Sequence, residues 1–196
     1  MKLLLMAAAA GVLMAGGLLL IAPVVILAAT VAPPSGAVGD TSDALAADRT
    51  AGGPGPVIAG DVACPIGRPH HFTDTWGAPR SGGRAHQGVD IFADTGVPLY
   101  AYRAGTVRLT SSRLGGISLW ITSEGGDRYY YAHLSGYAPG LQTGSRVEVG
   151  DLVGFNGNTG NARATPPHLH WEVHPGGGPA VNPTPYASAA CRGATP

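Results

Sequence analysis

The chain has 196 residues, of which 12 are basic and 12 are acidic, so its formal net charge is zero. This balance argues against a strongly basic surface, and nucleic acid is therefore not expected as a partner. The abundance of glycine (31 residues) and proline (17 residues) favours turns and short strands over long helices.

The N-terminal 30 residues are strongly apolar, and no charged residue lies between Leu3 and Gly39. About 20 apolar residues span a bilayer, whereas the apolar region of a signal peptide usually has about 7–15. We therefore expect residues 1–30 to form a signal-anchor transmembrane helix. A cleaved signal peptide is the alternative, because "AATVAPPS" offers small residues to a peptidase. Lys2 before the run and acidic residues after it predict that the rest of the chain lies outside the cytoplasm.

The next segment, residues 31–60, is rich in small residues, and 17 of its 30 positions are Ala, Gly or Pro. Such a composition predicts a disordered linker. The folded domain is expected over residues 61–196. Its two cysteines, Cys64 and Cys191, lie near its ends, and an even pair in an exported protein predicts a disulfide.

Short apolar or β-branched runs alternate with turn signals from Gly88 onward. "GVDIFA" is followed by "DTG", and "RVEVGDLVGFNG" by the glycine-containing "NTGNARATPP". The tetrapeptide "EGGD" separates "ISLWITS" from "RYYYAHL" and predicts a β-hairpin. Strands at this spacing predict an all-β fold, a compact antiparallel sheet or sandwich.

The histidines occur in groups that could hold a metal ion. "HQGVD" places His86 and Asp90 four residues apart, and "HLH" places His168 and His170 two apart. On a strand, residues two apart share a face, so the two histidines of "HLH" lie side by side. The same alternation predicts opposite faces for two sets of this segment: His168, His170 and Glu172 on one, and Leu169, Trp171 and Val173 on the other.

The strand "RYYYAHL" presents a further histidine, His133. Strict alternation places it on the face of Tyr129 and Tyr131, opposite Tyr130. A catalytic zinc takes three protein ligands and keeps a fourth position for water. The grouped residues supply three ligands and leave two histidines to carry protons or stabilise developing charge. Their spacing does not separate ligand from catalytic histidine within "HLH".

Four segments resemble the lysostaphin/LytM-type zinc metallopeptidases: "HQGVDIFADTGVPLYAYRAGTV", "YYAHL", "VGDLVGFNGNTGNA" and "TPPHLHWEV". The resemblance covers about residues 72–185. It implies a groove in the β domain, peptidoglycan stem peptides or cross-bridges as substrate, and one zinc ion. By this resemblance, His86, Asp90 and His170 hold the zinc, and His133 and His168 are the catalytic histidines.

Two other functions remain open at this stage. One is a non-catalytic peptidoglycan-binding or hydrolase-regulating module of the same fold, and the other is an unrelated zinc hydrolase on a β scaffold. The presence of all five motif residues favours the peptidase. The sequence leaves open the bond cut (D-Ala–diaminopimelate, D-Ala–Gly or Gly–Gly) and the oligomeric state.

Several other residues near the motifs have no firm assignment. Alternation places His174 on the face of His168 and His170, where it could be an extra groove residue, but a surface position is favoured. His70 and His71 have no assigned role. Arg80, Arg84 and the tyrosines of "RYYYAHL" could line the groove or serve in ordinary packing.

Overall fold

The computed structural model describes residues 55–191, so the predictions for residues 1–30 and for most of the linker lie outside the described part. Within the described residues, no helix is long and apolar enough to cross a membrane. The described chain is mostly β, as the sequence predicted, and it contains one short α-helix that the sequence did not predict.

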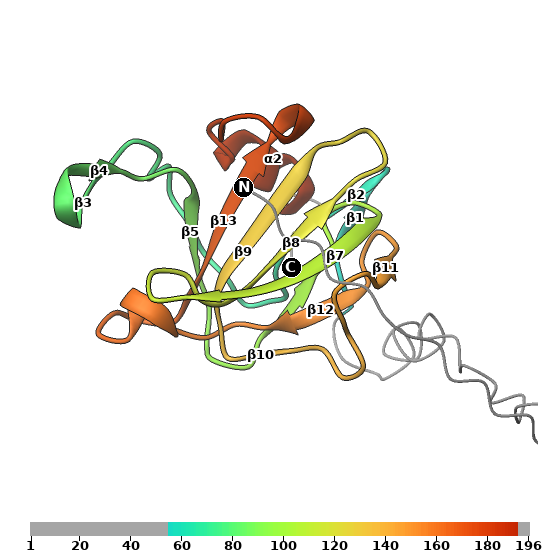
Figure 1. Cartoon of the computed structure of the whole chain (residues 1–196), viewed down its shortest axis with the longest axis horizontal. Coiled ribbons are helices and arrows are strands. Elements are labelled where there is room, and N and C mark those ends of the chain that lie inside the picture. Colours follow the sequence, from blue (N-terminus) through green and yellow to red (C-terminus); the bar gives the residue numbers. More distant parts are fainter. Residues whose placement is uncertain (1–54, 192–196) are drawn as a thin grey trace, which may run out of the picture. The chain divides into compact units, whose positions relative to one another are not determined.

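A six-stranded antiparallel sheet forms the main layer, with strand order β11-β7-β8-β9-β13-β5 (Figure 1). The loop predicted by "EGGD" joins the neighbouring strands β8 and β9. The strands of this sheet are β5 (Val89–Phe92), β7 (Gly105–Ser112), β8 (Gly116–Thr122), β9 (Arg128–Leu134), β11 (Arg146–Val147) and β13 (His168–His174).

A smaller antiparallel sheet has the order β10-β12-β6, and two short hairpins, β1–β2 and β3–β4, complete the β-structure. Its strands are β6 (Pro98–Tyr100), β10 (Gly136–Tyr137) and β12 (Leu152–Phe155). The hairpin strands are β1 (Ile58–Ala59), β2 (Val62–Ala63), β3 (Pro79–Arg80) and β4 (Arg84–Ala85). The helical segments are η2 (Ser81–Gly83), η3 (Gly160–Ala162), η4 (Pro175–Gly177) and α2 (Thr184–Cys191).

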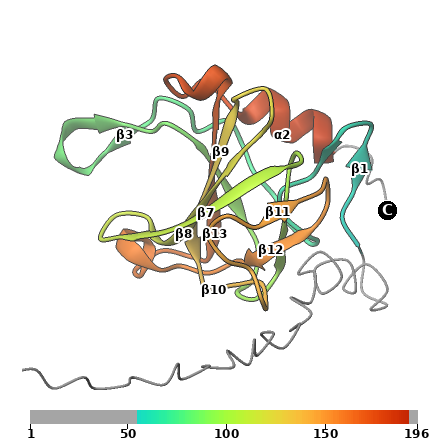
Figure 2. The ribbon, with the colours of Figure 1, turned by 45° about the vertical axis from the view of Figure 1, so that its right-hand side comes forward.

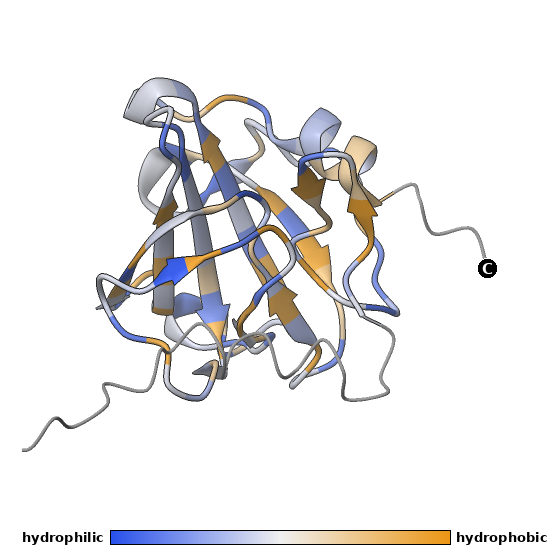
Figure 3. Ribbon diagram, turned by 90° about the vertical axis from the view of Figure 1, so that its right-hand side faces the viewer, coloured by the Kyte–Doolittle hydropathy of each residue, from blue (hydrophilic) through white to orange (hydrophobic). Residues whose placement is uncertain are grey.

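The core lies against one face of the main sheet, and strand β13 contributes a large part of it. Leu169 and Trp171 are fully buried and Val173 is 2% exposed, as the alternation of "HLHWEVH" predicted. Hydrophobic and hydrophilic residues alternate along the strands in Figure 3. One face of β13 is therefore held in the core, and the other is free to carry polar groups.

The two ends of the described domain are joined covalently. A disulfide links Cys64, which follows β2, to Cys191 at the end of α2, with 4.7 Å between their Cα atoms. Both cysteines are buried within the hydrophobic core. The two cysteines are 127 positions apart in the chain, and the segment between them contains every strand of the six-stranded and the three-stranded sheet.

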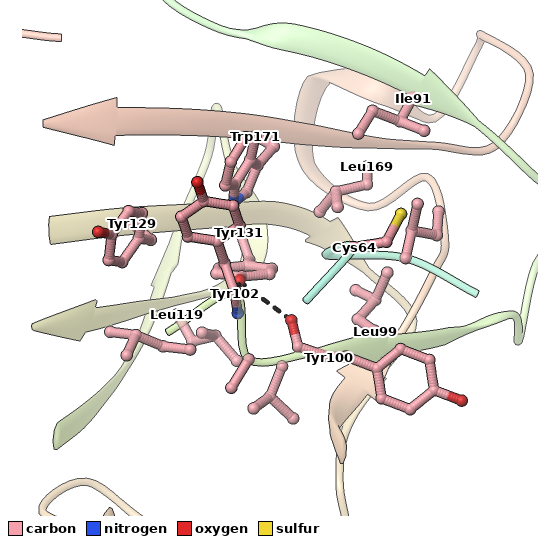
Figure 4. Close-up of a cluster of buried hydrophobic side chains, with 14 of the residues drawn as sticks. Cys64, Ile91, Leu99, Tyr100, Tyr102, Leu119, Tyr129, Tyr131, Leu169 and Trp171 are labelled. Carbon is pink, nitrogen blue, oxygen red and sulfur yellow. Dashed lines mark hydrogen bonds between the residues drawn. The ribbon is translucent and has the colours of Figure 1, made fainter. Parts of the chain in front are cut away.

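Tyr131 of β9 carries a polar group into the centre of this core (Figure 4). The side chain is fully buried, and its hydroxyl donates to the backbone carbonyl of Tyr100 at 3.0 Å. The same hydroxyl accepts a hydrogen bond from the backbone N–H of Tyr102 at 2.9 Å. One side-chain oxygen thus satisfies two backbone groups, one at the last residue of β6 and one two residues further along the chain.

We expect Tyr131→Phe to lower the free energy of unfolding by about 1–3 kcal/mol, because it leaves two buried backbone groups without this partner. Tyr129→Phe is the matched control, since its hydroxyl makes a long contact of 3.4 Å with the Asp127 carboxylate. Urea unfolding followed by tryptophan fluorescence measures both. Equal losses in the two variants would contradict the bridging role of the Tyr131 hydroxyl.

Candidate active site

A pocket of roughly 840 Å³ lies on the polar side of the main sheet. The β3–β4 hairpin and two loops, residues 112–115 and 161–166, contribute to its walls. In Figures 1 and 2 the hairpin and these loops extend from the same side of the domain. All five histidine and aspartate residues predicted for the site line this pocket: His86, Asp90, His133, His168 and His170.

The pairing of β13 with β5 brings together residues that are 80 positions apart in the chain. His170 lies directly opposite Asp90 in this antiparallel pair. Directly opposed side chains on one face of a sheet lie close enough to interact. The predicted same-face arrangement is confirmed, because His168, His170 and Glu172 all line the pocket.

Three side-chain atoms converge at the centre of the site. His86 Nε2 lies 2.9 Å from His170 Nδ1 and 3.0 Å from Asp90 Oδ1, and the last two atoms are 3.1 Å apart. All three residues are largely buried, and their ligand atoms form a cluster that could hold a metal ion. Two imidazole nitrogens and one carboxylate oxygen form a ligand set typical of catalytic zinc.

The hydrogen bonds around the cluster indicate which ring nitrogens carry protons. His86 Nδ1 lies 2.8 Å from the carbonyl oxygen of Thr75, and His170 Nε2 lies 2.8 Å from the carboxylate of Glu172. Because these outer partners are acceptors, the outer nitrogens are the donors in the neutral rings. The inner nitrogens then present lone pairs to each other and to Asp90. Three converging acceptors repel one another unless a cation lies between them, so this donor set fits a bound metal ion.

Without a metal ion, a second proton on His170 can take the place of a cation between these acceptors. Burial opposes charge on Asp90 and on His170, but it is outweighed by the hydrogen bonds of Asp90 with His170 and His86 and by those of His170 with Asp90 and Glu172. The pKa of Asp90 is therefore held well below its usual range, and that of His170 is raised. Burial likewise opposes the ionised form of Glu172, yet hydrogen bonds from His170 and His174 lower its pKa. The cluster thus favours positive charge at its centre.

His133 lines the pocket, whereas strict alternation along β9 predicted that it faces the core. Tyr129 and Tyr131 lie in the core, and Tyr130 lines the pocket, so alternation would have buried His133. Leu119 of β8 pairs with Tyr131, but Ile117 pairs with Leu134, which leaves one extra residue in β9. This β-bulge corrects the predicted facing of His133, since an extra residue shifts the alternation and re-aims a side chain.

The backbone of His133 shows how the bulge is maintained. His133 has φ of 69°, the left-handed region, and it is the one non-glycine residue with positive φ in the described chain. Such a conformation disfavours most side chains and is often retained at functional sites. The backbone N–H of His133 donates to the carbonyl of Gly115 at 2.8 Å, and the ring is anchored by the carbonyl of Thr159.

His133 and His168 share one tautomer. Nδ1 of His133 donates to the Thr159 carbonyl at 2.9 Å, and Nδ1 of His168 donates to the Pro166 carbonyl at 2.8 Å. In both neutral rings this leaves Nε2 as the acceptor. The two ring centres are 5.0 Å apart, and burial, together with the neighbouring histidines, lowers the pKa of His133 to about 4. His133 is therefore neutral near pH 7 and able to accept a proton.

Two residues of the site were not assigned from the sequence. Glu172 contacts His170 through one oxygen, and its other oxygen lies 2.7 Å from His174 Nε2. His174 is 9% exposed and its Nδ1 donates to the carbonyl of Gly178, so the expectation of a surface histidine was wrong. The sequence contained this information, because alternation along a strand places residues 168, 170, 172 and 174 on the same face.

The other residues named from the sequence lie either in the pocket, in the core or outside both. Arg80, Arg84 and Tyr130 line the pocket. Tyr129 and Tyr131 belong to the core. His71 does not line the pocket, but its ring stacks on that of Phe92, which does, with 5.4 Å between the ring centres.

A small β domain that presents a His–Asp–His cluster beside two further buried histidines has the features of a metallohydrolase. Comparison with known families makes this class specific. The chain belongs to peptidase family M23, whose model matches residues 84–183. This membership confirms the prediction of a LytM-type metallopeptidase domain.

Individual relatives agree with the family assignment. The chain is 36% identical over 118 residues to the L-Ala–D-Glu endopeptidase of Bacillus subtilis, covering 56% of this chain and 36% of the relative. It is 34% identical over 134 residues to the DD-carboxypeptidase/endopeptidase Mpg of Neisseria meningitidis, covering 67% and 28%. The chain thus spans about a third of the length of these curated relatives.

Solved structures show the same fold. The catalytic domain of lysostaphin from Staphylococcus simulans superposes with a TM-score of 0.53 at 29% identity, covering 61% of this chain and 92% of that domain. A putative glycyl-glycine endopeptidase LytM from Ruminococcus gnavus superposes with a TM-score of 0.61 at 30% identity, covering 70% and 63%.

We expect Glu172→Ala to weaken the affinity of the cluster for a divalent ion by about 10–100-fold, because the carboxylate fixes the tautomer and orientation of His170. Glu172→Gln keeps one acceptor oxygen and should weaken binding less. Titration with Co²⁺, followed by its visible absorption, measures the affinity without any substrate. Glu124→Ala is the control, since its exposed carboxylate pairs with Arg146 away from the pocket. Unchanged Co²⁺ affinity in Glu172→Ala would contradict the orienting role.

Proposed function

We propose that this protein is a zinc-dependent endopeptidase that hydrolyses peptide bonds in bacterial peptidoglycan, in stem peptides or cross-bridges. The observation that carries the proposal is the convergence of three ligand atoms beside two histidines whose Nε2 atoms can accept protons. Membership of peptidase family M23 supports the reaction class. Relatives that carry the names of endopeptidases support the substrate class.

In this proposal His86, Asp90 and His170 hold one zinc ion through the three converging atoms. Zinc would act as a Lewis acid on water and on the scissile carbonyl near neutral pH. The residues around the cluster orient the proposed ligands. The Thr75 carbonyl and the Glu172 carboxylate hold the two ligand rings so that the correct nitrogens face inward.

His133 and His168 are the proposed catalytic histidines. With Nδ1–H fixed on a backbone carbonyl, each ring presents Nε2 as the atom for proton transfer. Neutral His133 accepts a proton from the attacking water and then delivers it to the nitrogen of the leaving amine as the peptide bond breaks. His168 Nε2, 4.0 Å from Asp90 Oδ1, is placed to stabilise the negative charge that develops on the carbonyl oxygen once the ring is protonated.

The proposed place of action is outside the cytoplasm, where peptidoglycan lies. The N-terminal residues 1–30 would anchor the protein in the membrane, or release it if they are cleaved. A buried disulfide between Cys64 and Cys191 suits such an oxidising compartment.

We expect alanine substitutions in the site to fall into two groups. His86→Ala, Asp90→Ala and His170→Ala should lose zinc and activity together, because each removes a ligand. His133→Ala and His168→Ala should keep most of the zinc and still lose about 10²–10³ in rate, the usual effect of removing one transition-state group. Zinc content is measured by elemental analysis, and activity by dye release from labelled peptidoglycan.

His71→Gln provides the control, since this exposed histidine lies outside the pocket. Parent-level digestion by all five alanine variants would refute the peptidase. Loss of zinc in His168→Ala with retention in His170→Ala would reverse the roles of the two histidines.

A further inference from the structure

The β3–β4 hairpin places two positive charges opposite each other at the edge of the pocket. Arg80 and Arg84 are direct partners in this two-stranded ladder. The turn between them uses Gly82 and Gly83, both with positive φ of 73° and 70°, which L-residues with side chains rarely adopt. Like charges directly opposite each other destabilise a strand pair. The arrangement therefore favours an anion between or beside the two guanidinium groups.

The two arginines differ in the partners they already have. Arg80 Nη2 donates to Asp90 Oδ2 at 2.5 Å, the carboxylate oxygen that does not face the histidine cluster. Arg84 donates from Nε to the carbonyl oxygen of Ser81 at 3.1 Å and from Nη2 to the Ser81 hydroxyl at 3.4 Å, which leaves its other N–H groups free of these contacts. Among residues 55–191, no acidic side chain forms an ion pair with Arg84. Both arginines line the pocket, so donors of Arg84 remain available to a ligand there.

The overall charge of the pocket also favours an anionic ligand. The charged residues that line it are the two arginines and two carboxylates, Asp90 and Glu172. Both carboxylates are already engaged by histidines, and one of them also by Arg80. With a divalent ion bound and neutral histidines, positive charge exceeds negative charge. A substrate with a carboxylate near the scissile bond is then attracted more strongly than a neutral one.

We propose that Arg80 and Arg84 form a carboxylate-binding subsite, which makes the enzyme select peptides that carry free carboxylates close to the bond cut. This inference rests on the proposed function and narrows its substrate. Stem peptides contain carboxylate-bearing residues such as diaminopimelate, whereas the interior of a glycine cross-bridge contains none. The hairpin thus directs the protein toward stem peptides. Guanidinium groups suit this task because their planar donors match a carboxylate.

The test uses the full-length protein and two synthetic stem peptides that differ only in one group next to the scissile bond, a carboxylate or a carboxamide. The wild type should have a lower KM for the carboxylate peptide. Arg84→Gln should raise that KM about 5–30-fold, as expected for losing about 1–2 kcal/mol of charge-assisted binding. Its kcat and its KM for the carboxamide peptide should stay near the wild-type values. Arg84→Lys, which keeps the charge, should recover part of the effect.

Two controls separate this subsite from the metal cluster. Arg146→Gln removes an exposed arginine on β11 and should change neither KM. Equilibrium binding of a non-hydrolysable analogue of the carboxylate peptide to the zinc-loaded protein should weaken in Arg84→Gln, which gives a readout independent of turnover. Arg80→Gln should reduce the difference in KM between the two peptides. The Co²⁺ affinity of this variant is measured as well, because Arg80 also contacts Asp90 and its loss could disturb the cluster.

The outcomes distinguish the two proposals. Absence of hydrolysis of both peptides and of peptidoglycan would refute the proposed function. If the wild type hydrolyses both peptides with equal KM, the subsite is refuted and the peptidase proposal stands. The same holds if Arg84→Gln raises the KM for the two peptides by the same factor. The paired subsite is also refuted if Arg80→Gln alters Co²⁺ affinity but leaves the discrimination unchanged.

Discussion

The register between β13 and β5 is the constraint on which the site depends. It sets His170 directly opposite Asp90, and the apolar partners Leu169 and Trp171 hold that register because they are buried. A slip of one residue would move the apolar face to the pocket and the histidines into the core. The packing of β13 therefore specifies the His–Asp–His cluster as firmly as it specifies the fold. Through this register, residues 80 positions apart in the chain meet within hydrogen-bonding distance.

Regular alternation builds one half of the site, and a break in alternation builds the other. On β13 the period of two delivers His168 and His170 to the pocket. On β9 the same period would bury the histidine, and a bulge with a left-handed residue at His133 turns it outward. The strain of that residue is offset by hydrogen bonds from its backbone and ring to neighbouring loops. The position of His133 is thus fixed by contacts with neighbouring loops as well as by the sheet.

The sequence predicted the parts of the structure that depend on local pattern. The β class, the hairpin at "EGGD" and the facing of "HLHWEVH" followed from alternation and turn residues. The bulge at His133 could not be predicted, because it depends on how β9 pairs with β8. The burial of His174 was missed for a related reason. Alternation placed His174 on the face of His168 and His170. Its burial, however, depends on hydrogen bonds with the Glu172 carboxylate and the Gly178 carbonyl, which are set by the folded chain.

The outer hydrogen bonds of the cluster connect metal binding to the stability of the fold. Thr75 and Glu172 fix the two ligand rings in tautomers whose lone pairs converge with the Asp90 carboxylate. In the absence of a cation this convergence is unfavourable, and a bound ion removes the repulsion in the folded state only. Because the unfolded chain does not assemble the cluster, an ion bound there would stabilise the folded domain by linkage. The contacts of Thr75 and Glu172 with the two histidine rings would then couple ion binding to the packing of β13 against β5.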